Sequence, residues 1–268
     1  MIINDIKNAP AISAGAAVKY GFSAMRFNSS AVMKVFLLVI VPVCILNAYL
    51  MGMMADVQGS VDLTMIFSNP ELIEQFVLSP EYIRILVLNL LSMLIDGMLI
   101  PFGSMAVIYI VKEAFEEKKA DYKDALNVSF SCGVRFVICF ILYSLSIAVC
   151  SMFMAIPGII LSIVWYFYIH TLVLEDCKGI KAFGASREIT NGRWFKTVMY
   201  MITFYCMNYV VSYFLGIAFA GSTESFLANV IASSMLCYLS LIFTAAKTAV
   251  YINFKANKIV KKNKVMKN

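Results

Sequence analysis

The chain has 268 residues, of which 61% are hydrophobic and 14% are charged, and its mean hydropathy is +0.82. Soluble domains are about half apolar and about a quarter charged, so this composition excludes an ordinary soluble protein and predicts an integral membrane protein. The formal net charge of +6 averages over two unlike faces of such a protein, and it gives no indication of nucleic-acid binding.

The longest uncharged run indicates how the chain crosses the membrane. Residues 136–174 contain no Asp, Glu, Lys or Arg, and this length is about twice the roughly 20 residues that one helix needs to cross a bilayer. The run therefore predicts a helical hairpin, with its break at 155–158 (AIPG), because proline is tolerated in the first turn of a helix. The other uncharged runs are interpreted in the same way. They give six spans in all, at 35–55, 85–111, 136–155, 157–174, 197–220 and 225–246.

These spans make the chain one integral membrane domain, 1–268. It begins with a cytoplasmic interfacial segment, 1–34, continues as the bundle, 35–246, and ends with 247–268, the end of span six and a basic tail.

Lys and Arg indicate the orientation of the bundle. The segments before span one, between spans two and three, between spans four and five and after span six hold four, five, five and six of them, whereas the opposite side holds only Arg84. Short loops rich in Lys and Arg stay in the cytoplasm, so we expect both termini to be cytoplasmic. The basic face suits the anionic inner leaflet of a cell membrane, which makes membrane lipids the expected partners.

Three similar segments precede the odd-numbered spans. The stretches 16–36, 121–140 and 179–198 each combine a short amphipathic sequence, a small polar turn and a basic residue. A helix with one apolar and one charged face lies in the headgroup plane. We therefore predict an all-α bundle of three transmembrane hairpins, each preceded by a cytoplasmic interfacial helix. Such repeats occur in transporters, but also wherever a bundle grew by duplication.

The outer segment between spans one and two carries two helix starts. In SNPELIEQF (68–76) and in SPEYIRIL (79–86), Ser or Asn precedes Pro and Glu, which is the pattern of a helix N-terminus. One short surface helix followed by the start of span two is expected there.

Cysteine, histidine and methionine give no metal or redox pattern. None of the seven cysteines falls in the outer segment 56–84, so an outer disulfide is not expected. There is no CxxC pair and a single histidine, so zinc and haem sites are not expected, nor is a cofactor. The cluster MGMM at 51–54 is interpreted as flexible apolar packing rather than as a copper site.

Asp96 is the leading candidate for a functional residue. It lies near the middle of span two, with Gly97 and Gly103 after it. A carboxylate there costs about 2.5 to 3.5 kcal/mol on insertion scales, so it should face the bundle interior or water. Two interpretations are open. Asp96 is either a proton or cation relay beside a kinked helix, or a protonated side chain bonded to a neighbour such as Asn208 or Ser212.

Two weaker candidates lie near the cytoplasmic ends of spans. Lys247 is about 7 Å from the inner end of span six, whereas Asp96 is about 20 Å from the inner end of span two, which argues against an ion pair between them. Its long stem is expected to reach the interface instead. His170 could titrate near neutral pH, but a lone histidine is expected to be an interfacial packing residue rather than a catalytic group.

The stretch LEDCKGIKAFGASREITNGRWFK (174–196) resembles the signature of bacterial membrane proteins related to the membrane domain of glycerophosphoryl diester phosphodiesterases. The resemblance implies a six-span fold in a bacterial cell membrane. It implies no hydrolase activity, because those proteins carry out hydrolysis in a separate soluble barrel, which has no counterpart after span six. The matching residues are Glu175, Gly179, Ala182, Ser186, Asn191, Gly192, Arg193 and Trp194.

This stretch also has a purely structural interpretation. Glu175 ends span four, and 179–189 lies flat on the membrane before an Asn-Gly turn. Arg193 is expected to bind lipid phosphates, and Trp194 to lie at the level of the headgroups.

Three functions remain open. We expect a non-catalytic membrane protein that acts through lipids or a protein partner, as in envelope homeostasis, scaffolding or self-protection. The alternative is a permease, or the membrane subunit of a transporter or exporter, for a small molecule, lipid or peptide. An intramembrane enzyme is the third candidate, and the sequence offers no base, orienting group and nucleophile together to support it.

Overall fold

The computed structural model describes residues 6, 9, 11–59, 70–153, 155–177, 179–219 and 225–265, and every regular element in this part of the chain is a helix. The prediction of an all-α membrane protein with six spans is confirmed. The helices that are long and apolar enough to cross a membrane are Ser29–Gly59, Pro80–Phe115, Tyr122–Met152, Ile156–Leu174, Trp194–Phe219 and Phe226–Ile259.

The first hairpin consists of two long helices, each interrupted by a π-helical turn. Ser79 caps the second helix as expected, because its hydroxyl accepts a hydrogen bond from the Tyr82 amide at 3.2 Å. The short outer helix, α6, is also present where SNPELIEQF predicts it. The elements in order are α3 (Ser29–Val35), η1 (Phe36–Ile40), α4 (Val41–Gly59), α6 (Pro70–Val77), α7 (Pro80–Leu94), η2 (Ile95–Leu99) and α8 (Ile100–Phe115).

In the second hairpin, α9 (Tyr122–Phe153) ends and α10 (Ala155–Val164) begins just before the predicted break, so AIPG (155–158) forms the first turn of α10. The expected separate interfacial helix before span three is wrong, because α9 is one continuous helix. Gly133 lies inside this helix and makes room for a neighbouring ring, since a Cβ there would lie 2.8 Å from Phe102.

Span four also differs from the expectation of one uninterrupted helix. It is divided into α10 and α11 (Tyr168–Leu174) by a turn at 165–167. A break inside a membrane leaves backbone groups that must be bonded within the protein, and the following segment supplies those bonds, as described below.

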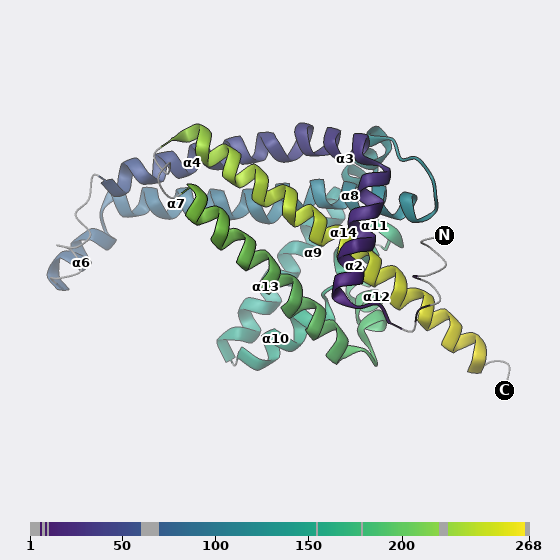
Figure 1. Cartoon of the computed structure of the whole chain (residues 1–268). Coiled ribbons are helices and arrows are strands. Elements are labelled where there is room, and N and C mark those ends of the chain that lie inside the picture. Colours follow the sequence, from purple (N-terminus) through teal and green to yellow (C-terminus); the bar gives the residue numbers. More distant parts are fainter. Residues whose placement is uncertain are drawn as a thin grey trace.

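The third hairpin is preceded by α12 (Lys181–Thr190) and consists of α13 (Trp194–Phe219) and α14 (Phe226–Val265). α14 has 40 residues, or about 60 Å of helix, which is twice the thickness of the hydrocarbon core. The helix therefore continues beyond residue 246, the predicted end of span six, into the basic tail. Its end projects past the bundle on the side where α2 lies (Figure 1).

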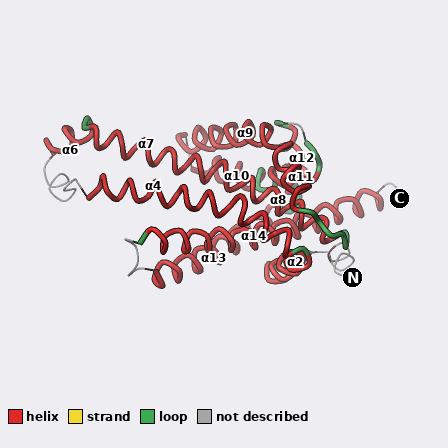
Figure 2. Tube along the Cα trace, turned by 90° about the horizontal axis from the view of Figure 1, so that it is seen from above, coloured by secondary structure: helices red, strands yellow, loops and turns green. Residues whose placement is uncertain are grey.

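The first described helix, α2 (Ala14–Phe27), crosses the long helices rather than running along them. Figure 1 shows it transverse to α4 and α8, and Figure 2, turned by 90°, shows it almost end-on. α2 ends at Asn28 and α12 ends just before Asn191. The segments before spans one and five therefore each contain a separate helix, as we predicted.

Gly21 is the point of closest approach between α2 and α14. A Cβ on Gly21 would lie 2.5 Å from the Ala246 nitrogen and 2.6 Å from the Ala245 carbonyl carbon. Those are backbone atoms, which cannot rotate away as the end of a side chain can. The absence of a side chain at residue 21 therefore sets the distance between the two helices.

We expect Gly21→Val to lower stability by about 2 kcal/mol or more, because overpacking against backbone forces α2 away from α14. Thermal unfolding of the purified protein in mild detergent measures the effect. Gly15→Val on the same helix is the matched control, because no atom lies within 4 Å of a Cβ there. Equal unfolding temperatures for the two variants would contradict this role of Gly21.

Candidate functional site

Asp96 lies in the π-helical turn η2, deep in the second span. It is 16 residues after Pro80, or about 24 Å along the helix. The Asn47 side chain of α4 donates to Asp96 Oδ1 at 2.5 Å, and the Ser92 hydroxyl donates to Asn47 Oδ1 at 2.8 Å. Ser92 therefore orients the Asn47 amide so that its N–H group points at the carboxylate. The sequence pointed to Asn208 or Ser212 as the partner, and the structure places Asn47 there instead.

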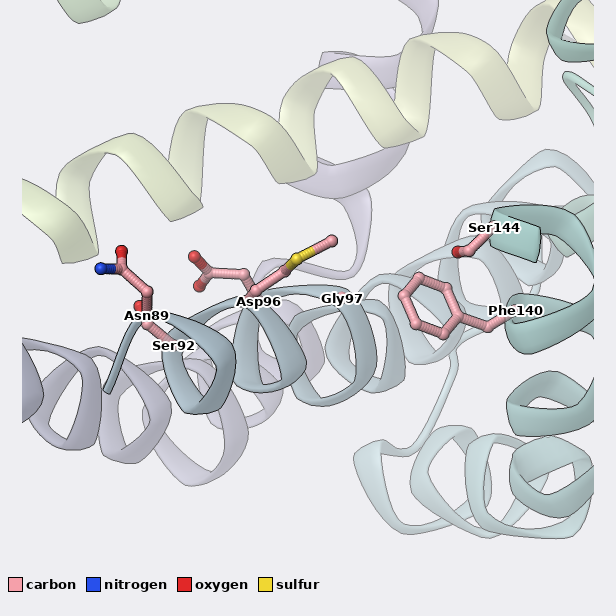
Figure 3. Close-up of a pocket in the computed structure, with 7 residues that line it drawn as sticks. Asn89, Ser92, Asp96, Gly97, Phe140 and Ser144 are labelled. Carbon is pink, nitrogen blue, oxygen red and sulfur yellow. The ribbon is translucent and has the colours of Figure 1, made fainter. Parts of the chain in front are cut away.

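Gly97, beside Asp96 in the π-helical turn, packs closely against α9. A Cβ on Gly97 would lie 2.5 Å from the Phe140 ring, so the glycine lets the α9 ring pack directly on the turn. Figure 3 shows the ring facing Gly97, while the Asp96 carboxylate points the other way along the helix, toward Asn89. π-helical turns inside α-helices are frequent at functional sites.

Asp96 lines two cavities, one on each side of η2. The α9 cavity, of about 550 Å³, lies between η2 and α9, and part of its lining is shown in Figure 3. The α14 cavity, of about 420 Å³, lies among four spans. The α9 cavity is lined by Asn89, Ser92, Met93, Asp96, Gly97, Phe140 and Ser144. The α14 cavity is lined by Val43, Cys44, Asn47, Asp96, Ile100, Asn208, Ser212, Ser233, Leu236, Cys237 and Ser240.

The α14 cavity brings together polar side chains that are far apart in sequence. Asn208 and Ser212, the predicted neighbours of Asp96, lie on its α13 wall. The ion pairs in the described part of the chain do not include Asp96. Its carboxylate therefore faces the cavity with amide and hydroxyl neighbours but without a cation.

Two thiols lie side by side on the wall of the α14 cavity. Cys44 Sγ of span one is 3.5 Å from Cys237 Sγ of span six, and all seven cysteines are free. Sequence reasoning missed this pair, because the two cysteines are 193 residues apart and no spacing motif connects them. Among the described residues, no group of three or more His, Cys, Asp or Glu is placed to hold a metal ion.

Lys247 lies against an aromatic ring of span four. Its ammonium is 4.8 Å from the centre of the Tyr166 ring, and α2 packs across α14 at the two preceding residues, Ala245 and Ala246. The expected reach to the interface stays a prediction. In agreement with the depth argument, none of the ion pairs in the described residues joins Lys247 to Asp96.

His170 is a buried packing residue. Its side chain is 4% exposed, its ring stacks on Tyr251 with centroids 5.6 Å apart, and it meets the Phe167 ring edge-on at 5.7 Å. Neither ring nitrogen has a side-chain or backbone partner by distance and angle within the described residues. His170 lines neither of the two cavities at Asp96.

Glu175 joins the end of span four to span six. It accepts a hydrogen bond from the Tyr251 hydroxyl and forms an ion pair with Lys255 at 3.1 Å. Glu175, which we expected only to end span four, therefore also holds that end against α14.

Ser186 forms hydrogen bonds with the backbone on both sides of the break in span four. Its hydroxyl accepts from the Phe167 amide at 3.1 Å and donates to the Val164 carbonyl at 3.0 Å. Thr190 donates to the same carbonyl at 3.3 Å. α12 therefore does not simply lie flat on the membrane, because its hydroxyls satisfy the backbone that the turn at 165–167 leaves open.

The glycines of this stretch occupy backbone conformations that other residues rarely adopt. Gly179 has φ +54° and Gly192 has φ +74°, both in the left-handed region that glycine enters without a steric penalty. They turn the chain into α12 and out of it. The resemblance to the phosphodiesterase membrane domains thus falls on residues that have structural roles here.

Arg193 is directed inward. Its guanidinium donates to the Phe254 carbonyl and lies 4.9 Å from the centre of the Phe254 ring. Burial lowers the pKa of Arg193, but an arginine stays protonated. Trp194 is 47% exposed, and its expected position at the headgroups stays a prediction.

Comparison with known proteins finds no matching family model, no matching curated protein and no matching solved structure. The relation to the phosphodiesterase membrane domains therefore stays a prediction from residues 174–196.

We expect Ser186→Ala to destabilise the protein by about 1 to 3 kcal/mol, because it leaves the Phe167 amide without a partner in a buried position. The unfolding temperature in detergent measures this cost. Ser162→Ala in α10 is the control, since the Ser162 hydroxyl donates to the Ile159 carbonyl of its own helix. A loss in Ser162→Ala as large as that in Ser186→Ala would contradict this role of Ser186.

Proposed function

We propose that this chain is a non-catalytic, multi-pass protein of the bacterial cell membrane, with both termini in the cytoplasm. We further propose that it works as a permease, or as the membrane subunit of a transporter, for a small cation or a solute that carries a positive charge. The observation that carries this proposal is Asp96, a carboxylate at mid-span depth that lines two open cavities with several other polar side chains.

The electrostatics of Asp96 favour a positively charged ligand. An ionised carboxylate in a low-dielectric interior is costly unless it is paired, hydrogen-bonded or hydrated. Asn47 provides one hydrogen bond, which lowers the cost without neutralising the charge. A cation that enters the α14 cavity would supply the missing charge, and it would meet amide and hydroxyl oxygens on the same walls.

The size and position of the cavities suit a transported solute. At about 420 and about 550 Å³, both fall within the range of small-molecule sites, about 300 to 1,000 Å³. Transporter sites commonly lie near the midplane beside interrupted helices. Here both helices are continuous, but Asp96 lies in a π-helical turn, and α4, which carries Asn47, follows the other one, η1.

A second candidate function, action through a protein partner, is favoured by the outer face of α13. Tyr205, Tyr209 and Tyr213 are spaced one turn apart and are 73%, 64% and 59% exposed. Tyr209 is about 22 Å along the helix from Trp194, where lipid would leave its hydroxyl without a hydrogen-bond partner. A neighbouring membrane protein that seats on this stripe would supply the acceptors.

We expect Asp96→Asn to reduce cation flux by about tenfold or more, since the variant loses the charge that offsets desolvation of the solute. Purified protein in liposomes, with a potential-sensitive dye and imposed gradients of Na⁺, K⁺, H⁺ or the cationic dye ethidium, measures the flux. Asp56→Asn at the outer end of α4 is the matched control. If wild-type liposomes pass these probes no faster than empty ones, or Asp96→Asn passes them equally well, the transport proposal is wrong.

For the second candidate, we expect the triple variant Tyr205→Phe, Tyr209→Phe, Tyr213→Phe to lose a co-purifying membrane protein in mild detergent. The change removes three hydroxyls and keeps the rings, so it tests the hydrogen bonds. Tyr49→Phe, another exposed tyrosine of a span, is the control. A wild-type chain that purifies without any associated protein would argue against this function.

A further inference from the structure

We propose that the α14 cavity holds a soft, monovalent metal cation such as Cu⁺ between the sulfurs of Cys44 and Cys237. This inference rests on the proposed function, for which it names the class of solute. It uses a pair of residues that are brought together only by the fold and that do not include the methionines of 51–54.

The geometry of the two thiols is close to that of a two-coordinate site. Their sulfurs are 3.5 Å apart. If each metal–sulfur bond were about 2.3 Å, as in zinc thiolate sites, a linear arrangement would place the sulfurs about 4.6 Å apart. The two side chains would therefore need to separate by about 1 Å, and the cavity that both of them line provides the space.

The chemistry of the thiols selects the class of metal. Thiolates are soft ligands and favour Cu⁺ over Na⁺, K⁺ or Mg²⁺, which prefer oxygen. Zn²⁺ also binds thiolates, but it almost always takes four ligands, and the described residues contain no cluster of three or more suitable side chains. A d¹⁰ monovalent cation needs only two donors on opposite sides, which is what this cavity wall offers.

Asp96 gives the site a way to manage protons and charge. Its carboxylate lines the same cavity and is near enough to interact electrostatically with both thiols. Binding is written as M⁺ + 2 RSH + Asp⁻ → [RS–M–SR]⁻ + AspH + H⁺. Two S–H bonds break and two metal–sulfur bonds form, one proton passes to Asp96, and the other leaves through the open cavity. No electron is transferred, so the step needs neither oxidant nor reductant.

The test uses Ag⁺ as a probe of the same class that does not change its oxidation state. Full-length protein in detergent is titrated with Ag⁺ against a competing chelator, and the metal retained per chain is measured by mass spectrometry. We expect one tightly held Ag⁺ per chain. Cys44→Ser, Cys237→Ser and the double variant should each weaken this site by about 100-fold or more, because two-coordinate binding fails when either sulfur is removed.

Cys150→Ser and Cys206→Ser are the matched controls, because both cysteines lie in spans and outside this cavity. They should keep the tight site. Cys44→Ala and Cys237→Ala repeat the test without a hydroxyl, and an unchanged unfolding temperature excludes a loss that is due only to misfolding. Tight binding that survives in the double variant, or that is equally lost in the controls, would overturn the proposal.

Flux measurements separate this inference from the proposed function. If Asp96→Asn abolishes cation flux while the cysteine variants hold Ag⁺ like the wild type, the transport function stands and the metal inference fails. If the cysteine pair binds Ag⁺ but no cation crosses the liposome membrane, the metal site stands and transport fails.

Discussion

Satisfaction of backbone hydrogen bonds inside an apolar solvent is the constraint on which the rest of this structure depends. Each unpaired N–H or C=O group in hydrocarbon costs several kcal/mol, yet span four is broken at 165–167. Outside the spans, a buried backbone group is also costly to leave unpaired, and the N-terminal segment is not a regular helix at residues 9 and 11–13. The protein meets the cost with side chains from other elements. Ser186 bonds both sides of the break in span four, and Asn253 of α14 donates to the Ile6 and Ala9 carbonyls at 2.6 and 3.0 Å.

The same constraint separates the polar groups of the α14 cavity into two kinds. The hydroxyls of Ser233 and Ser240 donate to carbonyls of their own helix, at 2.8 and 2.7 Å, so they do not require a ligand. Asp96 and the two thiols on the same walls are instead partnered across helices: Asn47 donates to Asp96, and the sulfurs of Cys44 and Cys237 contact each other. A ligand would therefore act on the groups that the helices themselves leave incompletely paired.

Local sequence was enough to find several elements and breaks. The helix start at AIPG and the Ser79 cap were predicted because proline and serine act on their own backbone, and the separate helices expected before spans one and five are present. The separate helix expected before span three was wrong, because no local signal distinguishes a glycine that turns the chain from one that, like Gly133, admits the Phe102 ring. The contact with Phe102, which decides between them, comes from another hairpin.

The sequence by itself determined that this protein crosses the membrane six times and that Asp96 lies deep within a span. Both results depend only on the hydropathy and charge of consecutive residues. The tertiary structure decided what Asp96 faces, that Cys44 and Cys237 touch, and that Lys247 lies against an aromatic ring of span four. Those results depend on the angle and spacing at which helices from distant parts of the chain cross. That spacing is set by contacts such as Gly21 against Ala246, which leave no trace in the hydropathy of either segment.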